Sequence, residues 1–110
     1  KFHYGFNKHS LDSEDLAFLK QHAAYLRQQP SVSVRVHGHS DNFGPEDYNR
    51  FLSRLRANAV ARILMQEGVA ESRILMSHWG SARPLATPED RAANRRVELE
   101  YLTLDVARAL

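Results

Sequence analysis

The segment SVSVRVHGHSDNFGPEDYNRFLSRLRANAVARILMQEG, residues 31–68, decides the fold because it joins the clearest strand pattern in the chain to the longest helical pattern. Valine alternates with other residues over positions 32–37, and this period of two predicts a β-strand. We expect the strand to end at Gly38 or His39. A polar turn then leads into the helical pattern, so polar side chains from the turn and from the helix could converge there.

A long amphipathic helix is expected from Pro45 to about Glu67. Pro45 suits the first helical turn, where its missing N–H is not needed, and Gly68 suits the far end, where a left-handed residue commonly caps a helix. The apolar stripe expected to face the core consists of Tyr48, Leu52, Leu55, Ala59 and Ile63, widened by Val60 and Leu64.

The flanking segments continue the alternation of strands and helices. Aromatic residues at every second position of residues 2–6 predict a short strand. A helical run follows Ser10 and should stop before Pro30, because the residue preceding a proline is pushed out of the helical region. Further strands are expected at residues 73–79 and 96–102. The pattern predicts an α/β (α+β) two-layer sandwich with the helices packed on one face of a small sheet.

Length and composition predict a single globular domain spanning residues 1–110. Hydrophobic residues make up 43% of the chain and charged residues 25%, and no apolar run approaches the roughly 20 residues of a membrane-spanning helix. Because the chain begins abruptly in a strand-like stretch, we expect it to be excised from a longer protein. The absence of cysteine excludes disulfides, thiolate metal ligands and a thiol nucleophile. A net charge of +2 is too small to indicate a nucleic-acid partner.

Polar residues form a second pattern on the long helix. Asn49, Ser53 and Arg56 are spaced by four and three residues, so they share a face that flanks the apolar stripe. Asp41 lies in the preceding turn. An arginine can grip a carboxylate with two parallel hydrogen bonds, and an aspartate offers two acceptors to an ammonium group. If the turn folds back beside the helix, Asp41 and Arg56 could hold the zwitterionic end of an amino acid. A plain ion pair between them, or two unrelated surface charges, is the alternative.

Three ordered motifs carry a resemblance to a known family. They are Gly38-His39-Ser40-Asp41, then Asn49-x-x-Leu52-Ser53-x-x-Arg56-Ala57-x-x-Val60, and then Asn94-Arg95-Arg96-Val97. Together they resemble the outer membrane protein A C-terminal domain (OmpA-like) family, which includes peptidoglycan-associated lipoproteins and the periplasmic domains of flagellar stator proteins. The resemblance extends from about Phe2 to Tyr101. It implies a βαβαβ-type sandwich with a mixed four-stranded sheet.

The resemblance also implies a function, which is non-covalent binding of peptidoglycan through the diaminopimelate of its stem peptide. Asp41 would contact the ammonium group of the ligand, and Arg56 would clamp its carboxylate. No catalytic residue, cofactor or metal is implied. The protein would be periplasmic, tethered to the outer membrane or cell envelope through an upstream region and not itself membrane-spanning. The other expected ligand contacts are Ser40, Phe43, Asn49, Leu52, Asn94 and Arg95.

Two rival functions are kept beside this one. His37, His39 and Asp41 have the spacing of metal ligands, which would suit a zinc hydrolase, although Asn42 stands where such a motif needs another histidine. The second rival is a protein-docking domain whose wall-binding site is degenerate or regulated, with an envelope protein or a second copy as its partner. Ser53 has no base placed by a motif, so nucleophilic catalysis is not supported.

Overall fold

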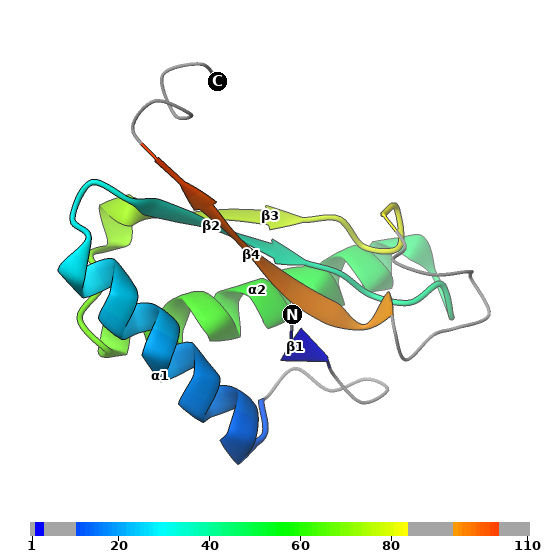
Figure 1. Ribbon diagram of the computed structural model, residues 1–110. Helices are drawn as coiled ribbons and strands as arrows, with labels where there is room; N and C mark the ends of the chain where they lie inside the picture. The colour runs from blue at the N-terminus through cyan, green and yellow to red at the C-terminus, as the bar shows by residue number, and fades with distance from the viewer. Residues whose placement is uncertain (1, 4–10, 84–93, 104–110) are drawn as a thin grey trace.

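The computed structural model describes residues 2–3, 11–83 and 94–103 of the chain. These residues form a sheet with two helices on one of its faces (Figure 1). Within them, no helix is both long enough and apolar enough to cross a membrane. In chain order, the elements are β1 (Phe2–His3), α1 (Ser13–Gln28), β2 (Ser33–Gly38), α2 (Glu46–Gln66), the short 3-10 helix η1 (Glu71–Arg73), β3 (Ile74–His78) and β4 (Arg96–Leu102).

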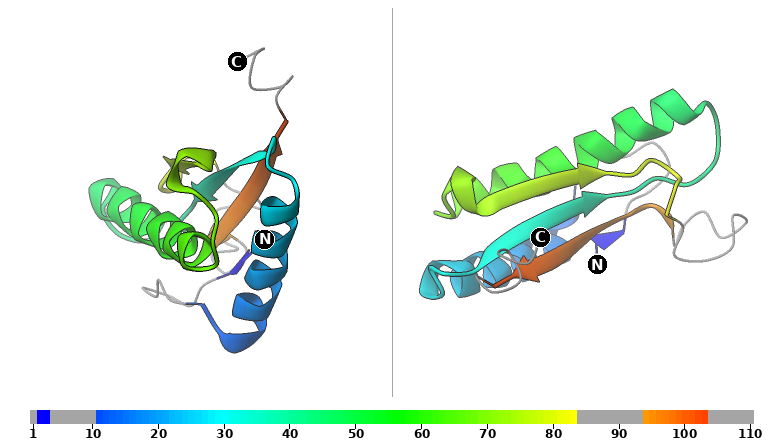
Figure 2. Two further views of the ribbon diagram at one scale, coloured as in Figure 1. Left: turned by 90° about the vertical axis from the view of Figure 1, so that its left-hand side faces the viewer. Right: turned by 90° about the horizontal axis from the view of Figure 1, so that it is seen from above.

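The sheet is mixed, with the strand order β1-β4-β2-β3. β2 pairs with β3 in parallel, whereas β4 is antiparallel to both β2 and β1. The three longer strands form the body of the sheet, and β1 adds two residues at the edge of β4. Both helices lie on the same side of this layer (Figure 2). The predicted two-layer arrangement of helices on one face of a mixed sheet is therefore confirmed.

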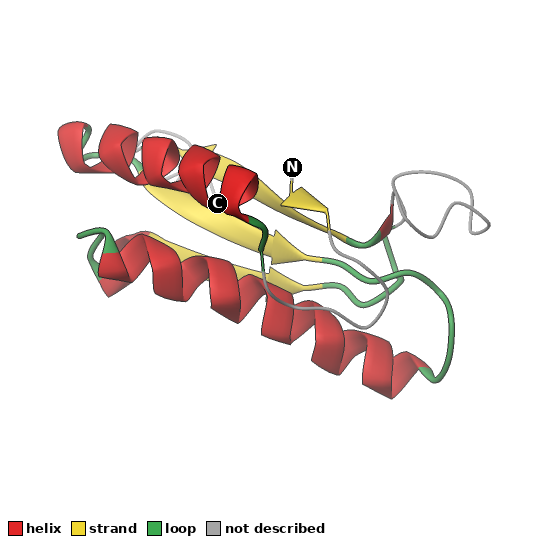
Figure 3. Cartoon of the chain, turned by 90° about the horizontal axis from the view of Figure 1, so that it is seen from below, coloured by secondary structure: helices red, strands yellow, loops and turns green. Residues whose placement is uncertain are grey.

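Strand direction brings two connections, β2–α2 and β3–β4, to one end of the sheet. Because β2 and β3 are parallel and β4 runs the opposite way, the last residues of β2 and β3 lie beside the first residues of β4 (Figure 3). Backbone hydrogen bonds join the connections there, from Trp79 N to Gly38 O at 3.0 Å and from Ser40 N to Gly80 O at 2.9 Å. The polar turn predicted after β2 is thus held between β3 and β4, at the end where α2 begins.

The core lies between the sheet and the two helices. Alternate residues of β2 are buried, as the period-two pattern predicts. At Gly38 the strand comes so close to α2 that a Cβ atom would clash with the backbone carbonyl of Ser53, so only glycine fits there. The buried apolar cluster consists of Leu19, Ala23, Leu26, Val32, Val34, Val36, Ala57, Val60, Leu64, Val69 and Val97.

The helix ends follow local capping chemistry, with two small corrections. α1 begins at Ser13, not directly after Ser10, because the Asp12 side chain accepts a hydrogen bond from Asp15 N at 2.8 Å and caps the first turn. Pro45 occupies the N-cap of α2 rather than its first turn. At the far end Gly68 has φ +96, as expected for a left-handed residue after a helix.

The face of α2 that packs on the sheet differs from the predicted stripe. Tyr48 is 43% exposed, and Leu55, Ala59 and Ile63 are only half-buried. The polar face predicted to flank the stripe is instead part of the buried face. This change matters for function, because it carries polar groups into the interior at the end of the sheet. The buried residues of α2 are Asn49, Leu52, Ser53, Arg56, Ala57, Val60, Ala61 and Leu64.

The remaining strand predictions agree with the structure where it describes them. β4 has the predicted bounds, and β3 is one residue shorter at each end than the predicted 73–79. Of the predicted strand at residues 2–6, the structure shows Phe2 and His3 paired with β4, and the rest lies outside the described residues.

Candidate functional site

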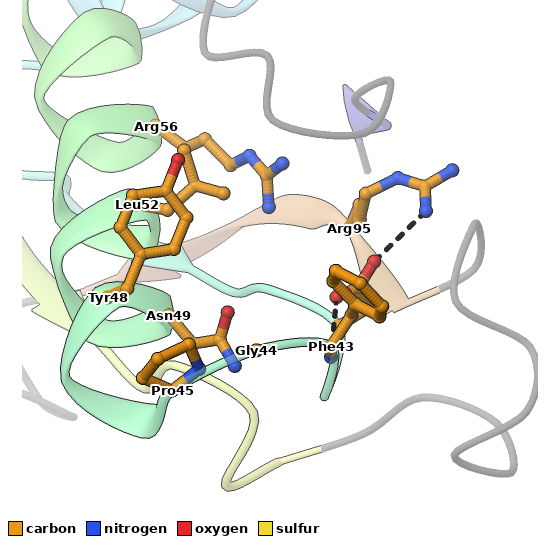
Figure 4. A pocket seen from close by; sticks show the side chains of 9 residues that line it. Phe43, Gly44, Pro45, Tyr48, Asn49, Leu52, Arg56 and Arg95 are labelled. Carbon is orange, nitrogen blue, oxygen red and sulfur yellow. Dashed lines mark hydrogen bonds and ion pairs between the residues drawn. The ribbon is translucent and has the colours of Figure 1, made fainter.

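A cavity of about 280 Å³ opens at the end of the sheet where the β2–α2 and β3–β4 connections meet, beside the first half of α2 (Figure 4). Its walls come from the β2–α2 turn, from α2 and from the residue just before β4. Six of the eight residues expected to contact a ligand line it. The complete lining is Asp41, Phe43, Gly44, Pro45, Tyr48, Asn49, Leu52, Arg56 and Arg95.

Asp41 supplies the acid of the cavity, and both of its carboxylate oxygens are engaged. Its Oδ1 accepts a hydrogen bond from the backbone N–H of Phe43 at 3.0 Å, which fixes the turn locally. Its Oδ2 accepts one from Arg95 Nη1, also at 3.0 Å, in an ion pair across the cavity wall. The residue is only 5% exposed, so this pair is less screened by water than a surface pair.

Arg56 supplies a buried cation from the middle of α2. The residue is 0% exposed, and an arginine is fully buried only where its guanidinium has partners. Its Nη1 donates a hydrogen bond of 2.9 Å to the backbone carbonyl of His39, which ties the helix to the start of the turn. The side chain reaches from the helix towards Arg95 on the opposite wall (Figure 4). Asp41 and Arg56 therefore converge on one cavity, as the turn-folding hypothesis requires.

Asn49 adds an amide whose nitrogen is buried and has no hydrogen-bond partner. The residue is 2% exposed and lines the cavity from the first half of α2. Leaving a buried N–H donor unsatisfied costs about 1–3 kcal/mol, so such a group in a cavity wall indicates a place where a ligand acceptor can bind.

Aromatic side chains form the outer rim of the cavity. Phe43 is 49% exposed and Tyr48 is 43% exposed, and Leu52 forms an apolar wall deeper in the cavity. Sequence reasoning missed Tyr48, which it assigned to the core. Its spacing could have revealed the true position, because Tyr48, Leu52 and Arg56 are four residues apart and share one helix face. Gly44 and Pro45 were also missed, although both belong to the turn that carries the motif.

Ser40 and Asn94, the other two expected contacts, are buried but are not part of the cavity lining. The Ser40 hydroxyl donates to the backbone carbonyl of Asp41 at 3.1 Å. The backbone carbonyl of Asn94 accepts a long hydrogen bond from Arg96 at 3.5 Å. Each of them directly precedes a cavity residue in the chain, Asp41 and Arg95 respectively.

The two histidines suspected as metal ligands, His37 at the end of β2 and His39 just after it, contact groups other than Asp41. His37 Nε2 lies 2.8 Å from a Glu100 carboxylate oxygen, and its Nδ1 accepts a hydrogen bond from Trp79 Nε1 at 3.0 Å. The His39 ring is buried with no hydrogen-bond partner on either nitrogen, and burial, reinforced by Arg96, lowers its pKa to about 4.

No cluster of three or more His, Cys, Asp or Glu side chains that could hold a metal ion occurs in the part of the chain that the structure describes. Within the suspected metal motif, His37 pairs with Glu100 and Asp41 with Arg95. What the cavity does offer is an acid, two guanidinium groups and an amide donor beside apolar walls. Such a set can bind a small ligand with an ammonium group and carboxylate groups.

The comparison with known protein families decides the assignment. The OmpA family matches residues 3–98. The chain belongs to the OmpA family. All three sequence motifs fall within the matched residues, as the resemblance predicted.

Individual OmpA-family proteins are similar over most of this chain. Outer membrane porin F of Pseudomonas aeruginosa is 42% identical over 101 residues, which cover 88% of this chain and 29% of the porin. Peptidoglycan-binding protein ArfA of Mycobacterium tuberculosis is 40% identical over 99 residues, which cover 87% of this chain and 30% of ArfA. The chain thus spans less than a third of these two relatives. The crystal structure of the peptidoglycan-associated lipoprotein from Burkholderia pseudomallei superposes with a TM-score of 0.88 at 32% identity, covering 92% of this chain and 88% of that one.

Proposed function

We propose that this domain binds peptidoglycan non-covalently through the diaminopimelate of the stem peptide, and so anchors an envelope protein to the cell wall. The observation that carries the proposal is the convergence of Asp41 and Arg56 on one cavity beside a buried amide donor without a partner. The names of two relatives, a peptidoglycan-associated lipoprotein and a peptidoglycan-binding protein, support the same polymer as the ligand.

The distal end of diaminopimelate is an amino-acid head group with one ammonium and one carboxylate. The Asp41 carboxylate would accept hydrogen bonds from the ammonium group, because a buried carboxylate forms strong charge-assisted hydrogen bonds. Arg56 would clamp the carboxylate with its planar fork, and its contact with the His39 carbonyl positions that fork in advance. The Asn49 amide would donate to the same carboxylate.

The remainder of the ligand matches the rest of the cavity. Between its two ends diaminopimelate has an aliphatic chain, which would pack between Leu52 and the aromatic rim of Phe43 and Tyr48. The proposed role is binding without catalysis. It implies a periplasmic domain, tethered to the envelope by another part of a longer protein.

Sedimentation with insoluble peptidoglycan tests the proposal. Asp41→Ala and Arg56→Ala proteins are expected to stay in the supernatant, with affinity lowered about tenfold or more because each loses a charge-assisted contact. Arg62→Ala and Asp47→Ala serve as matched controls, since both residues are exposed on α2 outside the cavity lining. The controls should sediment like the parent.

Because Arg56 is fully buried, Arg56→Lys is a second variant for the carboxylate contact. It keeps the charge but lacks the planar fork, so binding should still fall while the protein stays folded, which thermal melting checks. If folded Asp41→Ala and Arg56→Lys proteins sediment as fully as the parent, the proposed site is wrong.

Calorimetry with free meso-diaminopimelate separates wall binding from the rival role as a protein-docking domain. An intact site gives a heat of binding that Asp41→Ala abolishes. A degenerate site gives no heat with the parent protein, and that result would favour the docking role.

A further inference from the structure

The Asp41 carboxylate already has a partner within the protein itself, because Arg95 forms an ion pair with it. The Arg95 guanidinium lies 3.0 Å from Asp41 Oδ2, and the backbone N–H of Phe43 occupies Oδ1. Arg56 is placed differently, since its guanidinium donates to the His39 carbonyl. The cavity therefore contains an arginine anchored to the backbone and a second arginine paired with the acid that would receive the ligand.

The charges that line the cavity determine which ligands can replace Arg95 on Asp41. They are one carboxylate, from Asp41, and two guanidinium groups, from Arg56 and Arg95, so the net charge of the lining is +1. A simple ammonium ion entering the cavity would raise that charge to +2. It would also have to share Asp41 with Arg95 or displace Arg95 from it. In a buried setting like-charge repulsion of this kind is strongly unfavourable.

A zwitterionic head group meets no such penalty. Its ammonium can take the place of Arg95 on Asp41, while its carboxylate, held by Arg56, also offers Arg95 a new anionic partner. The net charge of the site is unchanged, and the ion pair is exchanged rather than broken. The same arginine that repels a bare amine would then hold an amino acid.

We propose that Arg95 acts as a specificity filter, which admits ligands with a carboxylate beside their ammonium group and rejects simple amines. This inference rests on the proposed binding of diaminopimelate and adds the rule by which the site chooses that ligand. Selectivity arises here from a repulsive element as well as from attraction. By this rule, stem peptides that present a plain lysine-type amine bind poorly.

Calorimetry with two matched probes tests the filter. The probes are meso-diaminopimelate and cadaverine, the diamine that remains when both carboxylates of diaminopimelate are removed. The parent protein should bind meso-diaminopimelate at least about tenfold more tightly than cadaverine. In Arg95→Gln, affinity for cadaverine should rise and affinity for meso-diaminopimelate should fall, so the ratio narrows about tenfold or more. Arg95→Lys keeps the positive charge and should retain most of the ratio.

Two further measurements keep the outcome decisive. Thermal melting establishes that Arg95→Gln is folded, and Arg95→Met, which preserves the aliphatic stem, replaces it if it is not. If an uncharged variant weakens both probes by the same factor, or leaves the ratio unchanged, Arg95 is an ordinary contact and the filter is wrong. If the parent gives no heat with meso-diaminopimelate, the proposed function itself fails and the filter fails with it.

Discussion

Arg56 and Arg73 lie at opposite ends of the domain, and both donate hydrogen bonds to backbone carbonyls outside their own element. They differ in that Arg56 also lines the cavity, whereas Arg73 does not. Arg73 Nη2 donates to the carbonyls of Leu26, Gln29 and Val32 at 2.6–2.8 Å, and its Nε donates to Val32 O at 3.0 Å. These carbonyls belong to the last turn of α1 and the residues that follow it, so Arg73 ties the end of the helix to the residues that lead into β2.

At the other end of the domain, the polar side chains of Arg56 and Asn49 line a cavity instead. Arg56 donates a hydrogen bond to the His39 carbonyl and lines the cavity, and the nearby Asn49 amide nitrogen is buried without a hydrogen-bond partner. Under the proposed function, this difference separates the residues that stabilise the fold from those that bind the ligand. One end uses its guanidinium to satisfy the protein's own carbonyls, whereas the other retains donors that a ligand can satisfy.

The largest effect on stability is expected from removing the guanidinium of Arg73, at the end of the domain opposite the cavity. Arg73→Met keeps an aliphatic side chain but removes the guanidinium hydrogen bonds to three carbonyls, which should lower the free energy of unfolding by about 2–3 kcal/mol. Urea unfolding measures this loss. Affinity of the folded variant for meso-diaminopimelate should not change, because Arg73 is remote from the cavity lining.

Arg62→Met is the matched control, since Arg62 is exposed on α2 and its replacement should change stability by less than about 0.5 kcal/mol. Equal destabilisation by the two substitutions would mean that the carbonyl contacts of Arg73 contribute nothing beyond those of a surface arginine.

Acid should lower the free energy of unfolding through His39, which lies at the cavity end of the sheet. Burial, and then the charge of Arg96, lower the pKa of His39 to about 4 in the folded protein from 6.5 in the unfolded chain. Folding therefore favours the neutral ring, so the stabilisation is complete above pH 6.5 and is lost as the pH falls towards 4. The expected loss is about 2 kcal/mol by pH 5. Since the His39 carbonyl holds Arg56, the cavity should loosen with it.

Urea unfolding between pH 7.5 and pH 5 measures this term, with His39→Gln as the comparison. The glutamine variant has no proton to bind at this position, so its stability should fall about 2 kcal/mol less over the same interval. Parallel pH profiles for the two proteins would show that His39 is not the titrating group.

Much of the fold could be predicted because its signals are local. The strict alternation of β2 and β4 sets their bounds, and Pro45 and Gly68 mark the ends of α2 through backbone chemistry that needs no tertiary context. The buried face of α2 could not be predicted in the same way. Apolar residues occur nearly all around that helix, so hydropathy alone does not distinguish the stripe containing Leu55 and Ile63 from the true face.

The polar residues of that face are buried for reasons that only the tertiary structure shows. The Ser53 hydroxyl accepts a hydrogen bond from Gly80 N at 3.0 Å, in a connection 27 residues away, and Arg56 holds the carbonyl of His39. The family motifs predicted Asp41, Arg56 and Arg95 as ligand contacts without such knowledge, and all three line the cavity. They could not reveal that Asp41 is already paired with Arg95, or that Arg73 binds the carbonyls at the end of α1. Both facts depend on contacts between segments that are distant in the sequence.

The smallest effect on stability, and the sharpest test of the contrast, is expected at Asn49. Its amide nitrogen is buried without a partner, so Asn49→Ala removes an unsatisfied donor and should not lower the free energy of unfolding. Affinity for meso-diaminopimelate should nevertheless fall about tenfold, because the donor for the ligand carboxylate is gone. Asn49→Asp, which replaces that donor by a negative charge, should weaken binding further, whereas Asn58→Ala on the same helix should leave it unchanged. A variant at Asn49 that binds normally but unfolds readily would reverse the assignment and make this residue part of the scaffold, like Arg73.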